Sequence, residues 1–405
     1  MNIVFANKYY FPKGGAEVYM FDLQDLLVGK GHTVVPFAMK DGRNRSTGWS
    51  DRFVSPVETE RVKFNLSGLK TAGRVVYSFE ARRKFARLLR EVKPDLVHAH
   101  NIYHQISPSI LAAANDSKVP VVMTAHDYHL IAPNYSLFHD GNICEHTRPA
   151  SYWRAVTNRC VKGSVAASAL EAFAMSVHRS LGLYPGGIDR IIAPSAWMAA
   201  MLEEYGVDGT KIVHVPYYID TKQWTESPSG DYALFIGRLS PEKGVDTLIR
   251  AAAIAKEVPV RIVGTGPEDM KLHKLAEKLG TDNVTFVGWK KGEDLKAEYE
   301  RARFVVVPSV WYEVFGLVVF EAYASGKPVI ATQMGGLSEI VRHDETGKLV
   351  SAGDAEGLAS SMKALWNSQE QCALMGRRAR KWVEHEFTPA RHYEDIIGVY
   401  KEVMG

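Results

Sequence analysis

The chain contains little cysteine and no long apolar segment. Three cysteines in 405 residues, Cys144, Cys160 and Cys372, are too few for the disulfide framework of a small secreted domain. No uninterrupted apolar run reaches the roughly 20 residues that a membrane-spanning helix needs. The apolar pattern of a strand already begins at Ile3, which leaves no room for a secretion signal before it. We therefore expect a cytoplasmic protein that is at most peripheral on the inner face of the membrane.

Other signatures are missing as well. The formal net charge of +3 is nearly neutral for this length, which argues against a nucleic-acid partner. Gly264 and Gly266 lack the third glycine of the Gly-x-Gly-x-x-Gly fingerprint, which counts against a nicotinamide-dependent enzyme. The histidines and cysteines of the first half follow no standard zinc spacing, so we expect no metal ion. These residues are His98, His100, His104, His129, Cys144, His146 and Cys160.

What the sequence does contain is a regular alternation of short apolar runs with amphipathic segments. Strands alternating with helices predict an α/β fold with parallel, doubly wound sheets, and the length predicts two domains. The runs expected to form strands are Ile3–Ala6, Thr33–Phe37, Leu96–Ala99, Val119–Thr124, Ile191–Ala193, Ala233–Ile236, Val260–Val263, Val284–Val287, Phe304–Val307, Val329–Ala331 and Leu349–Val350.

The stretch from Phe304 to Ala331 is the most informative part of the sequence. A strand pattern ends at Pro308, a short polar loop carries Glu313, and a helix pattern beginning near Gly316 carries Glu321. In an open α/β sheet, a loop between a strand and the following helix faces the ligand crevice. The free N–H groups at the start of this helix suit a phosphate group. The residues that would present them are Phe315, Gly316 and Leu317.

A second loop of the same kind follows the strand pattern Ala233–Ile236. It carries Arg238 and Lys243 and leads into a helix. A guanidinium offers phosphate a two-pronged hydrogen bond, and an ammonium offers it a point charge. The loop is therefore expected to bind phosphate, although two ordinary surface cations would produce the same sequence pattern. In the first half, paired glycines at Gly14 and Gly15 open the first helix and would let an anion approach the backbone closely.

These segments resemble family 4 retaining glycosyltransferases. The resemblance rests on Glu313 and Glu321 with seven residues between them around Phe-Gly-Leu, and on the loop Gly237-Arg-x4-Lys243-Gly. It implies a GT-B fold, in which two Rossmann-like domains face a central cleft and a C-terminal helix crosses back. The expected domains are 1–205 with the returning helix 388–405, on the acceptor side, and 206–387, which binds the nucleotide sugar.

The resemblance also implies roles for individual residues. Glu313 would bind hydroxyls of the sugar, Glu321 would bind the ribose, and Arg238 with Lys243 would neutralise the two phosphates. His126, just past a buried strand, would contact the sugar near the reacting carbon, although a lone histidine is more often structural. Gly14 and Gly15 would lie near the phosphates. The nucleotide base would lie beside Gly264, Val287 and Gly288.

The implied function is a hexosyl transfer from a UDP- or GDP-sugar, with retention and without a metal, since no Asp-x-Asp motif is present. The acceptor would be a saccharide or a lipid-linked saccharide in polysaccharide or glycolipid synthesis. The alternatives are a catalytically silent nucleotide-sugar-binding protein and a GT-B phosphorylase or epimerase. An amphipathic basic segment is expected to be a solvated helix face, with contact to an anionic membrane as the second interpretation. Its cations include Arg82, Arg83, Lys84 and Arg87.

Overall fold

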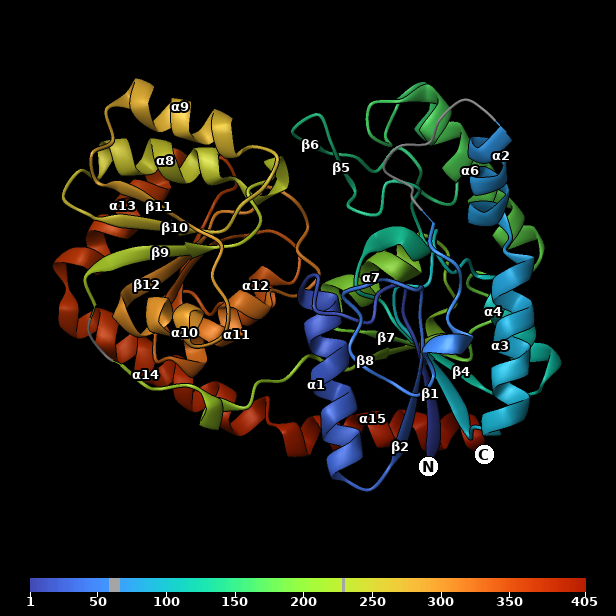
Figure 1. The fold of residues 1–405 in the computed structure, drawn as a ribbon. Helices are drawn as coiled ribbons and strands as arrows, with labels where there is room; N and C mark the ends of the chain where they lie inside the picture. Colours follow the sequence, from blue (N-terminus) through green and yellow to red (C-terminus); the bar gives the residue numbers. More distant parts are fainter. Residues whose placement is uncertain (58–65, 228–229) are drawn as a thin grey trace. The chain divides into compact units, whose positions relative to one another are not determined.

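The computed structural model describes residues 1–57, 66–227 and 230–405. It consists of two compact units, each built on a parallel sheet (Figure 1). Unit 1 comprises Met1–His139, Cys144–Val215 and Tyr393–Gly405, and unit 2 comprises Asp140–Ile143 and Pro216–His392. The predicted α/β architecture with two Rossmann-like sheets is confirmed.

The sheet of unit 1 has six parallel strands in the order β2-β1-β3-β4-β7-β8. Near-continuous apolar sequences explain why the inner strands β1, β3 and β4 are buried on both faces. The strands are β1 (Asn2–Ala6), β2 (Thr33–Phe37), β3 (Leu96–Ala99), β4 (Val121–Thr124), β7 (Arg190–Ala193) and β8 (Ile212–His214). The helices assigned wholly to this unit are α1 (Gly15–Gly29), α2 (Leu66–Val76), α3 (Phe79–Val92), α4 (Ser109–Asp116), α5 (Arg154–Thr157), α6 (Val165–Ser180) and α7 (Ala196–Glu204).

The sheet of unit 2 also has six parallel strands, in the order β11-β10-β9-β12-β13-β14. They are β9 (Tyr232–Ile236), β10 (Val260–Val263), β11 (Val284–Gly288), β12 (Ala302–Val307), β13 (Val329–Thr332) and β14 (Gly347–Val350). Helices cover both faces of this sheet (Figure 1). They are α8 (Val245–Ile254), α9 (Asp269–Leu279), α10 (Gly292–Arg301), α11 (Leu317–Ala324), α12 (Leu337–Ile340), α13 (Ala355–Asn367) and α14 (Gln369–Glu386).

The strand orders fix where a ligand can bind. In unit 2 the sequence order of the strands reverses between β9 and β12, so the loops after these two strands diverge to opposite faces. In unit 1 the corresponding point lies between β1 and β3. Ligands of open α/β sheets bind outside the carboxyl ends of the strands at such a switch point.

The C-terminal helix α15 (Pro389–Met404) begins in unit 2, and from Tyr393 onward its residues belong to unit 1. There the Tyr400 hydroxyl lies 2.6 Å from Nδ1 of His98 on β3, and both side chains are fully buried. The hydroxyl of Tyr393 lies 2.8 Å from Nε2 of His32. These polar contacts fasten the helix to the sheet of unit 1.

Two local features differ from the sequence-based expectation. Ile212–His214 forms strand β8 beside β7, so unit 1 continues to Val215, whereas the sequence placed the division between 205 and 206. Residues 41–73 interrupt the alternation with a polar, glycine- and asparagine-containing sequence, which predicts a loop insertion. They contain the start of helix α2, and residues 58–65 lie outside the described part of the chain. No helix in the described ranges is both long and apolar enough to cross a membrane.

Candidate functional site

The strongest cluster of predicted residues lies at the switch point of unit 2. Lys243 follows β9 and Glu313 follows β12, the two neighbouring strands between which the order reverses. Nζ of Lys243 donates a hydrogen bond of 2.7 Å to Oε1 of Glu313. Oγ of Ser309 donates a second hydrogen bond of 2.6 Å to the same oxygen. The structure therefore joins two residues that the sequence singled out separately.

The environment of Glu313 keeps its carboxylate ionised. Burial by itself would raise the pKa of this carboxyl, since the side chain is almost fully enclosed. The charge of Lys243 and the hydrogen bonds from Lys243 and Ser309 outweigh burial and hold the pKa below its usual value. Glu313 is thus suited to accept hydrogen bonds from hydroxyl groups and unsuited to donate a proton.

The loop that carries Lys243 packs tightly against the loop that carries Glu313. The N–H of Val310 donates to the carbonyl of Glu242 at 2.9 Å. Gly244 has a φ of +64°, and a Cβ there would lie 2.0 Å from the carbonyl oxygen of Pro308. Only glycine meets both conditions without displacement of the backbone. Arg238 in the same loop is exposed, so its guanidinium is accessible to a ligand.

The start of α11 lies on the same loop as Glu313. In the part of the chain that the structure describes, the N–H groups of Phe315, Gly316 and Leu317 donate no backbone hydrogen bond. These N–H groups are the unsatisfied donors of a helix N-terminus, which carries partial positive charge. Together with Arg238 and Lys243, they give this edge of unit 2 the donors that a diphosphate requires.

Gly264, just after β10, and Gly288, the last residue of β11, lie side by side at the same edge of the sheet. The N–H of Gly264 donates to the carbonyl of Gly288 at 2.8 Å. The N–H of Gly237 donates to the carbonyl of Val263 at 3.0 Å, which ties these turns to the loop of Arg238. Val287 is half-buried beside them. The three residues predicted to lie by the nucleotide base are therefore neighbours.

Glu321 has a neighbour that the sequence did not suggest. Oη of Tyr299 on α10 donates a hydrogen bond of 2.5 Å to Oε2 of Glu321. Tyr299 is fully buried and Glu321 is half-buried. This hydrogen bond helps to hold α11 against α10, so Glu321 has a structural role in addition to any binding role.

His126 lies at the carboxyl end of β4 in unit 1, in a stack of imidazoles. Its Nε2 is hydrogen-bonded to Nδ1 of His100 at 2.9 Å, and the rings stack with centroids 5.1 Å apart. His100 stacks in turn on His98. Burial and the charge of Lys8 lower the pKa of His126 to about 3. His126 is therefore a neutral imidazole at neutral pH, able to exchange hydrogen bonds but carrying no charge.

The glycine loop of unit 1 is less constrained than the sequence suggested. Gly14 and Gly15 are exposed, and Gly14 has an extended backbone that any residue adopts. A Cβ on Gly14 would make only an ordinary contact with Glu17.

Sequence reasoning missed Lys8 nearby, whose Nζ lies 3.8 Å from the centroid of the Tyr103 ring. Burial lowers the pKa of this lysine, while Asp127 and Glu17 oppose the shift.

Sequence reasoning also missed Gly335 and Gly336, which follow β13. The N–H of Gly336 donates to the carbonyl of Glu313 at 2.7 Å. A Cβ on Gly335 would lie 2.4 Å from that carbonyl oxygen. This glycine pair supports the backbone that presents Glu313. The sequence pattern could have predicted them, because paired glycines just past a strand are the same pattern that singled out Gly14 and Gly15.

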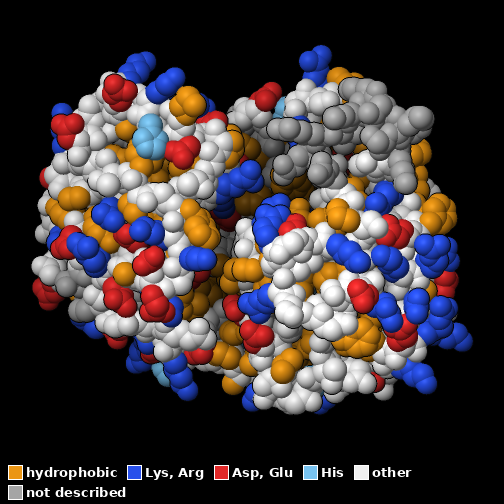
Figure 2. Space-filling view, viewed as in Figure 1, with side chains coloured by type: hydrophobic (Ala, Val, Ile, Leu, Met, Phe, Trp, Pro, Cys, Tyr) orange, Lys and Arg blue, Asp and Glu red, His pale blue; other side chains and the backbone are white. Residues whose placement is uncertain are grey.

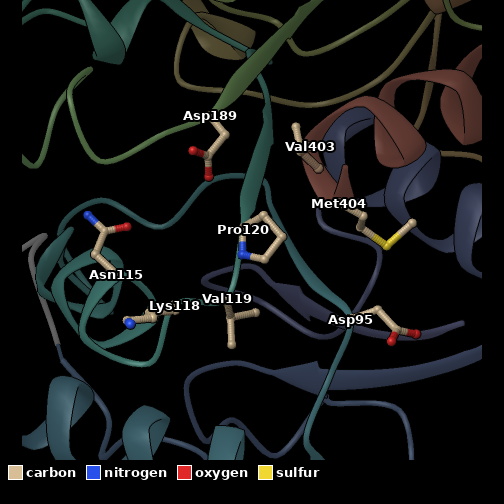
Figure 3. A pocket seen from close by; sticks show the side chains of 8 residues that line it. All are labelled: Asp95, Asn115, Lys118, Val119, Pro120, Asp189, Val403 and Met404. Carbon is tan, nitrogen blue, oxygen red and sulfur yellow. The ribbon is translucent and has the colours of Figure 1, made fainter.

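Unit 1 also has a pocket of about 620 Å³ at the opposite edge of its sheet (Figure 3). Its carboxylates cap the starts of strands. Asp189 accepts a hydrogen bond of 2.7 Å from the N–H of Val121, and Asp95 accepts one of 2.7 Å from the N–H of Asn2. Because ligands bind at the carboxyl ends of parallel strands, this pocket is not the candidate site.

The basic segment forms helix α3, whose buried face includes Phe85, Leu88 and Leu89. Lys and Arg side chains gather over this helix in Figure 2. Arg82 pairs with Asp116 at 2.7 Å and Arg87 with Glu91 at 2.9 Å. Lys84 pairs with Glu80 and also donates to a backbone carbonyl. Arg83 is exposed. Neighbouring carboxylates therefore offset much of the positive charge of the segment.

The three cysteines are free thiols. Sγ of Cys144 and Sγ of Cys160 lie 3.2 Å apart and share a hydrogen bond. This bond, opposed by burial, lowers the pKa of Cys144 to about 6. Cys372 lies apart in unit 2, and burial raises its pKa to about 11.

Comparison with known proteins gives two family matches. Residues 13–223 match Glycosyltransferase Family 4, and residues 219–382 match the glycosyl transferases group 1. The matches meet at the passage from unit 1 to unit 2 and together cover most of both units.

Individual relatives are similar over different shares of their length. The chain is 27% identical over 356 residues to an uncharacterized 42.6 kDa protein in the cps region of Klebsiella pneumoniae, covering 84% of this chain and 88% of that protein. It is 33% identical over 251 residues to a D-inositol 3-phosphate glycosyltransferase of Salinispora tropica, covering 53% and 51%. It is 26% identical over 229 residues to an O-antigen chain mannosyltransferase C of Escherichia coli, covering 54% and 62%. The chain thus spans little more than half the length of the two relatives with a named activity.

Solved structures show the same fold over nearly the whole chain. Sucrose-phosphate synthase from Thermosynechococcus elongatus has a TM-score of 0.74 at 21% identity, covering 99% of this chain and 98% of that one. HepE of Anabaena, in complex with UDP-glucose, has a TM-score of 0.72 at 20% identity, covering 99% and 100%. At these identities the likeness concerns the fold alone.

Proposed function

The chain belongs to glycosyltransferase family 4, and we propose that it transfers a hexose from a UDP- or GDP-sugar with retention and without a metal ion. The observation that carries the proposal is the Lys243–Glu313 pair at the switch point of unit 2. The enzyme class that the sequence predicted, a glycosyltransferase, is confirmed by the family match. The donor, the stereochemistry and the metal independence are the parts proposed here.

The diphosphate is the leaving group, and it gains negative charge as the bond between the anomeric carbon and the phosphate oxygen breaks. Fixed positive groups stabilise such charge when they are already in place. In unit 2 these groups are Arg238, Lys243 and the N–H groups at the start of α11. They would neutralise the diphosphate as a metal ion does in enzymes with an Asp-x-Asp motif, and so they support a metal-free reaction.

Glu313 would orient the sugar. Its ionised carboxylate, held by Lys243 and Ser309, accepts hydrogen bonds from sugar hydroxyls and leaves the Lys243 ammonium directed toward the same ligand. We assign no nucleophile among the protein's own residues. Instead, the acceptor oxygen would bond directly to the anomeric carbon on the face that the diphosphate leaves, and the departing phosphate oxygen would take the acceptor proton. The neutral imidazole of His126 would hydrogen-bond to the donor sugar.

Glu321 would bind the ribose, and Gly264, Val287 and Gly288 would lie beside the base. HepE binds UDP-glucose, which favours a UDP-sugar among the donors to be tried first. The acceptor would be a saccharide or a lipid-linked saccharide, which agrees with relatives that include an O-antigen chain mannosyltransferase and a protein in a cps region. A lipid-linked acceptor would place the protein on the cytoplasmic face of the membrane.

The test begins with thermal unfolding in a panel of UDP-, GDP- and ADP-sugars, because a ligand that binds only the folded state raises its stability. The stabilising donor is then incubated with saccharide acceptors, and the anomeric configuration of the product is read by NMR. Retention of configuration, and activity that survives EDTA, are expected. Inverted product contradicts the mechanism, as does activity lost on chelation and restored by Mg²⁺ or Mn²⁺. A donor that binds but is never transferred or hydrolysed supports the silent binding protein, and its conversion without acceptor supports an epimerase.

A further inference from the structure

Unit 1 contains a buried cluster of two histidines and a glutamate that the proposed reaction does not use. His104 lies in the loop after β3, His129 lies in the 3₁₀ turn η2 (Tyr128–Leu130), and Glu171 lies on α6. Their side chains are 20%, 3% and 10% exposed, respectively. Three separate segments thus bring two imidazoles and one carboxylate together inside the unit.

The spacing of the donor atoms suits one metal ion. Nε2 of His104 lies 2.9 Å from Oε1 of Glu171, and Nε2 of His129 lies 3.6 Å from Oε2 of Glu171. One ligand atom from each of the three residues lies within 4.8 Å of the others. Two donors that are each about 2.0–2.1 Å from a tetrahedral zinc ion stand about 3.3 Å apart. The two observed distances bracket that value.

A second observation points to a missing ligand. In the described part of the chain, both ring nitrogens of His129 are buried without a hydrogen-bond partner. The 3.6 Å separation from Glu171 is too long for a hydrogen bond. Burying a polar group without a partner costs free energy. A contact between His104 and Glu171 alone would leave the ring nitrogens of His129 buried without a partner. A metal ion would satisfy a nitrogen of His129 together with the other two residues.

We propose that His104, His129 and Glu171 bind a zinc ion. Two histidines and one glutamate with a fourth position for water form an established zinc ligand set. The ion would fasten the turn after His126 and Asp127 to helix α6, so it would hold in place the segment 127–162, which lies between β4 and α6 in the chain. It would lie in unit 1, whereas the groups proposed to bind the diphosphate lie in unit 2. This revises the expectation that no metal is present, which rested on sequence spacing.

In the sequence analysis, His104 and His129 were considered but set aside because their spacing matches no standard zinc pattern, and Glu171, which is far from both in the chain, was missed. Cys144, His146 and Cys160 attracted attention as possible ligands. Among the described residues, however, none of them joins a cluster of three donors. His146 is exposed and lies in the same segment, 127–162, as His129, so it serves as a matched control.

The experiment uses the full chain without a polyhistidine tag, stripped with EDTA and then dialysed. Zinc is titrated in competition with a chelating dye, and cobalt is added separately to read the absorption of a tetrahedral site. We expect one zinc per chain, with affinity reduced at least about 100-fold in Glu171→Gln and His129→Asn and unchanged in His146→Asn. The cobalt spectrum of the wild type should show nitrogen and oxygen ligation without thiolate charge transfer.

Circular dichroism establishes that each variant is folded, and stabilisation of unit 2 by UDP provides an independent check. A folded, metal-stripped wild type that binds no zinc at micromolar concentrations overturns the proposal. Equal loss of binding in His146→Asn and Glu171→Gln also overturns it, because the ion would then be held elsewhere. Should the ligand variants fail to fold, the stoichiometry and the cobalt spectrum of the wild type decide the question.

Discussion

Lys243 and Glu313 are 70 positions apart in the chain, yet Nζ of Lys243 lies 2.7 Å from Oε1 of Glu313. The pair couples the loop that would bind phosphate to the loop that would bind sugar. Removing either side chain leaves the other without its counterion, so the two residues are expected to be energetically coupled.

Lys243→Ala should reduce sugar transfer by roughly 100-fold, because a charge that stabilises the departing diphosphate is lost. It should also destabilise the protein, since Glu313 is left buried without its counterion. Adding Glu313→Gln to Lys243→Ala should restore part of the stability without restoring the activity. Urea unfolding and initial rates of the single and double variants measure both effects. A double variant that is less stable than Lys243→Ala would disprove the coupling.

Gly244→Ala should damage the same site through the backbone. The new methyl group would meet the carbonyl oxygen of Pro308 at 2.0 Å, so the loop that carries Lys243 must move. Gly280→Ala is the matched control, because Gly280 has a similar φ of +60° but a methyl group there would have no atom within 4 Å. The control should lose only about 1 kcal/mol of stability, the cost of the left-handed conformation. Equal loss of transfer in both variants would show that conformational strain, and not the contact with Pro308, is responsible.

Glu321→Ala should weaken binding of UDP while leaving binding of pyrophosphate unchanged, if the Glu321 carboxylate binds the ribose. Tyr299→Phe removes only the hydrogen bond that Glu321 accepts at 2.5 Å, and so measures the structural part of the effect. Calorimetry with both ligands separates the two contributions. Parallel weakening of UDP and pyrophosphate would assign Glu321 to the support of α11.

The low pKa of His126, about 3, makes a prediction about acid stability. An unfolded histidine titrates near a pKa of about 6.5, so between these values the unfolded chain binds a proton that the folded chain does not. The buried neutral imidazole therefore makes its full contribution to the free energy of unfolding above about pH 6.5, and this contribution is lost as the pH falls toward 3. The advantage of the wild type over His126→Gln should shrink between pH 7.5 and pH 5.5.

His100, Tyr19 and Lys8 face the same ring and remain in both proteins. The pKa of His100 also responds to His126, so stability alone does not separate the two histidines. Urea unfolding at the two pH values gives the stabilities. NMR of ¹⁵N-labelled histidine gives the protonation state directly. An imidazolium signal from His126 above pH 5 in the folded protein would contradict the assignment.

Helix α3 supplies a test of membrane attachment. Arg83 and Arg90 are exposed, whereas Arg82 and Lys84 contact neighbouring groups, so the first two are the cations available to a membrane. Wild-type protein should sediment with anionic vesicles at low salt and less at high salt. Arg83→Glu with Arg90→Glu should weaken sedimentation, and Lys278→Glu on the exposed face of α9 should not. Absence of sedimentation at low salt would favour a solvated helix and a soluble acceptor.

Apolar periodicity was enough to predict every strand of the two six-stranded sheets except Ile212–His214. Phe304–Val307 was expected to form a strand and lies within Ala302–Val307, because a run of large apolar residues buried on both faces has few alternatives. The short strand Ile212–His214 was missed since it lies at the edge of its sheet and is only partly buried. Helix α2 was missed because its glycines resemble those of a loop.

The candidate site was predicted residue by residue but not as a set of contacts. The sequence placed Lys243 and Glu313 on loops after strands, yet their hydrogen bond depends on β9 and β12 being neighbours, which follows from the strand order. The same holds for Tyr299 and Glu321. The cluster of His104, His129 and Glu171 draws on three segments whose proximity no local spacing encodes.

The discontinuity of unit 1 also constrains how the protein is made. Tyr400 hydrogen-bonds to His98 on a central strand, so the interior of unit 1 is incomplete until residues 393–405 are added. A ribosome synthesises all of unit 2 before those residues, because unit 2 ends at His392. Domains usually fold in order from the N-terminus during translation, but here the N-terminal half must wait. All strands of unit 2 are therefore synthesised before unit 1 is complete. The unit that carries His126 finishes folding only after synthesis has passed Tyr400.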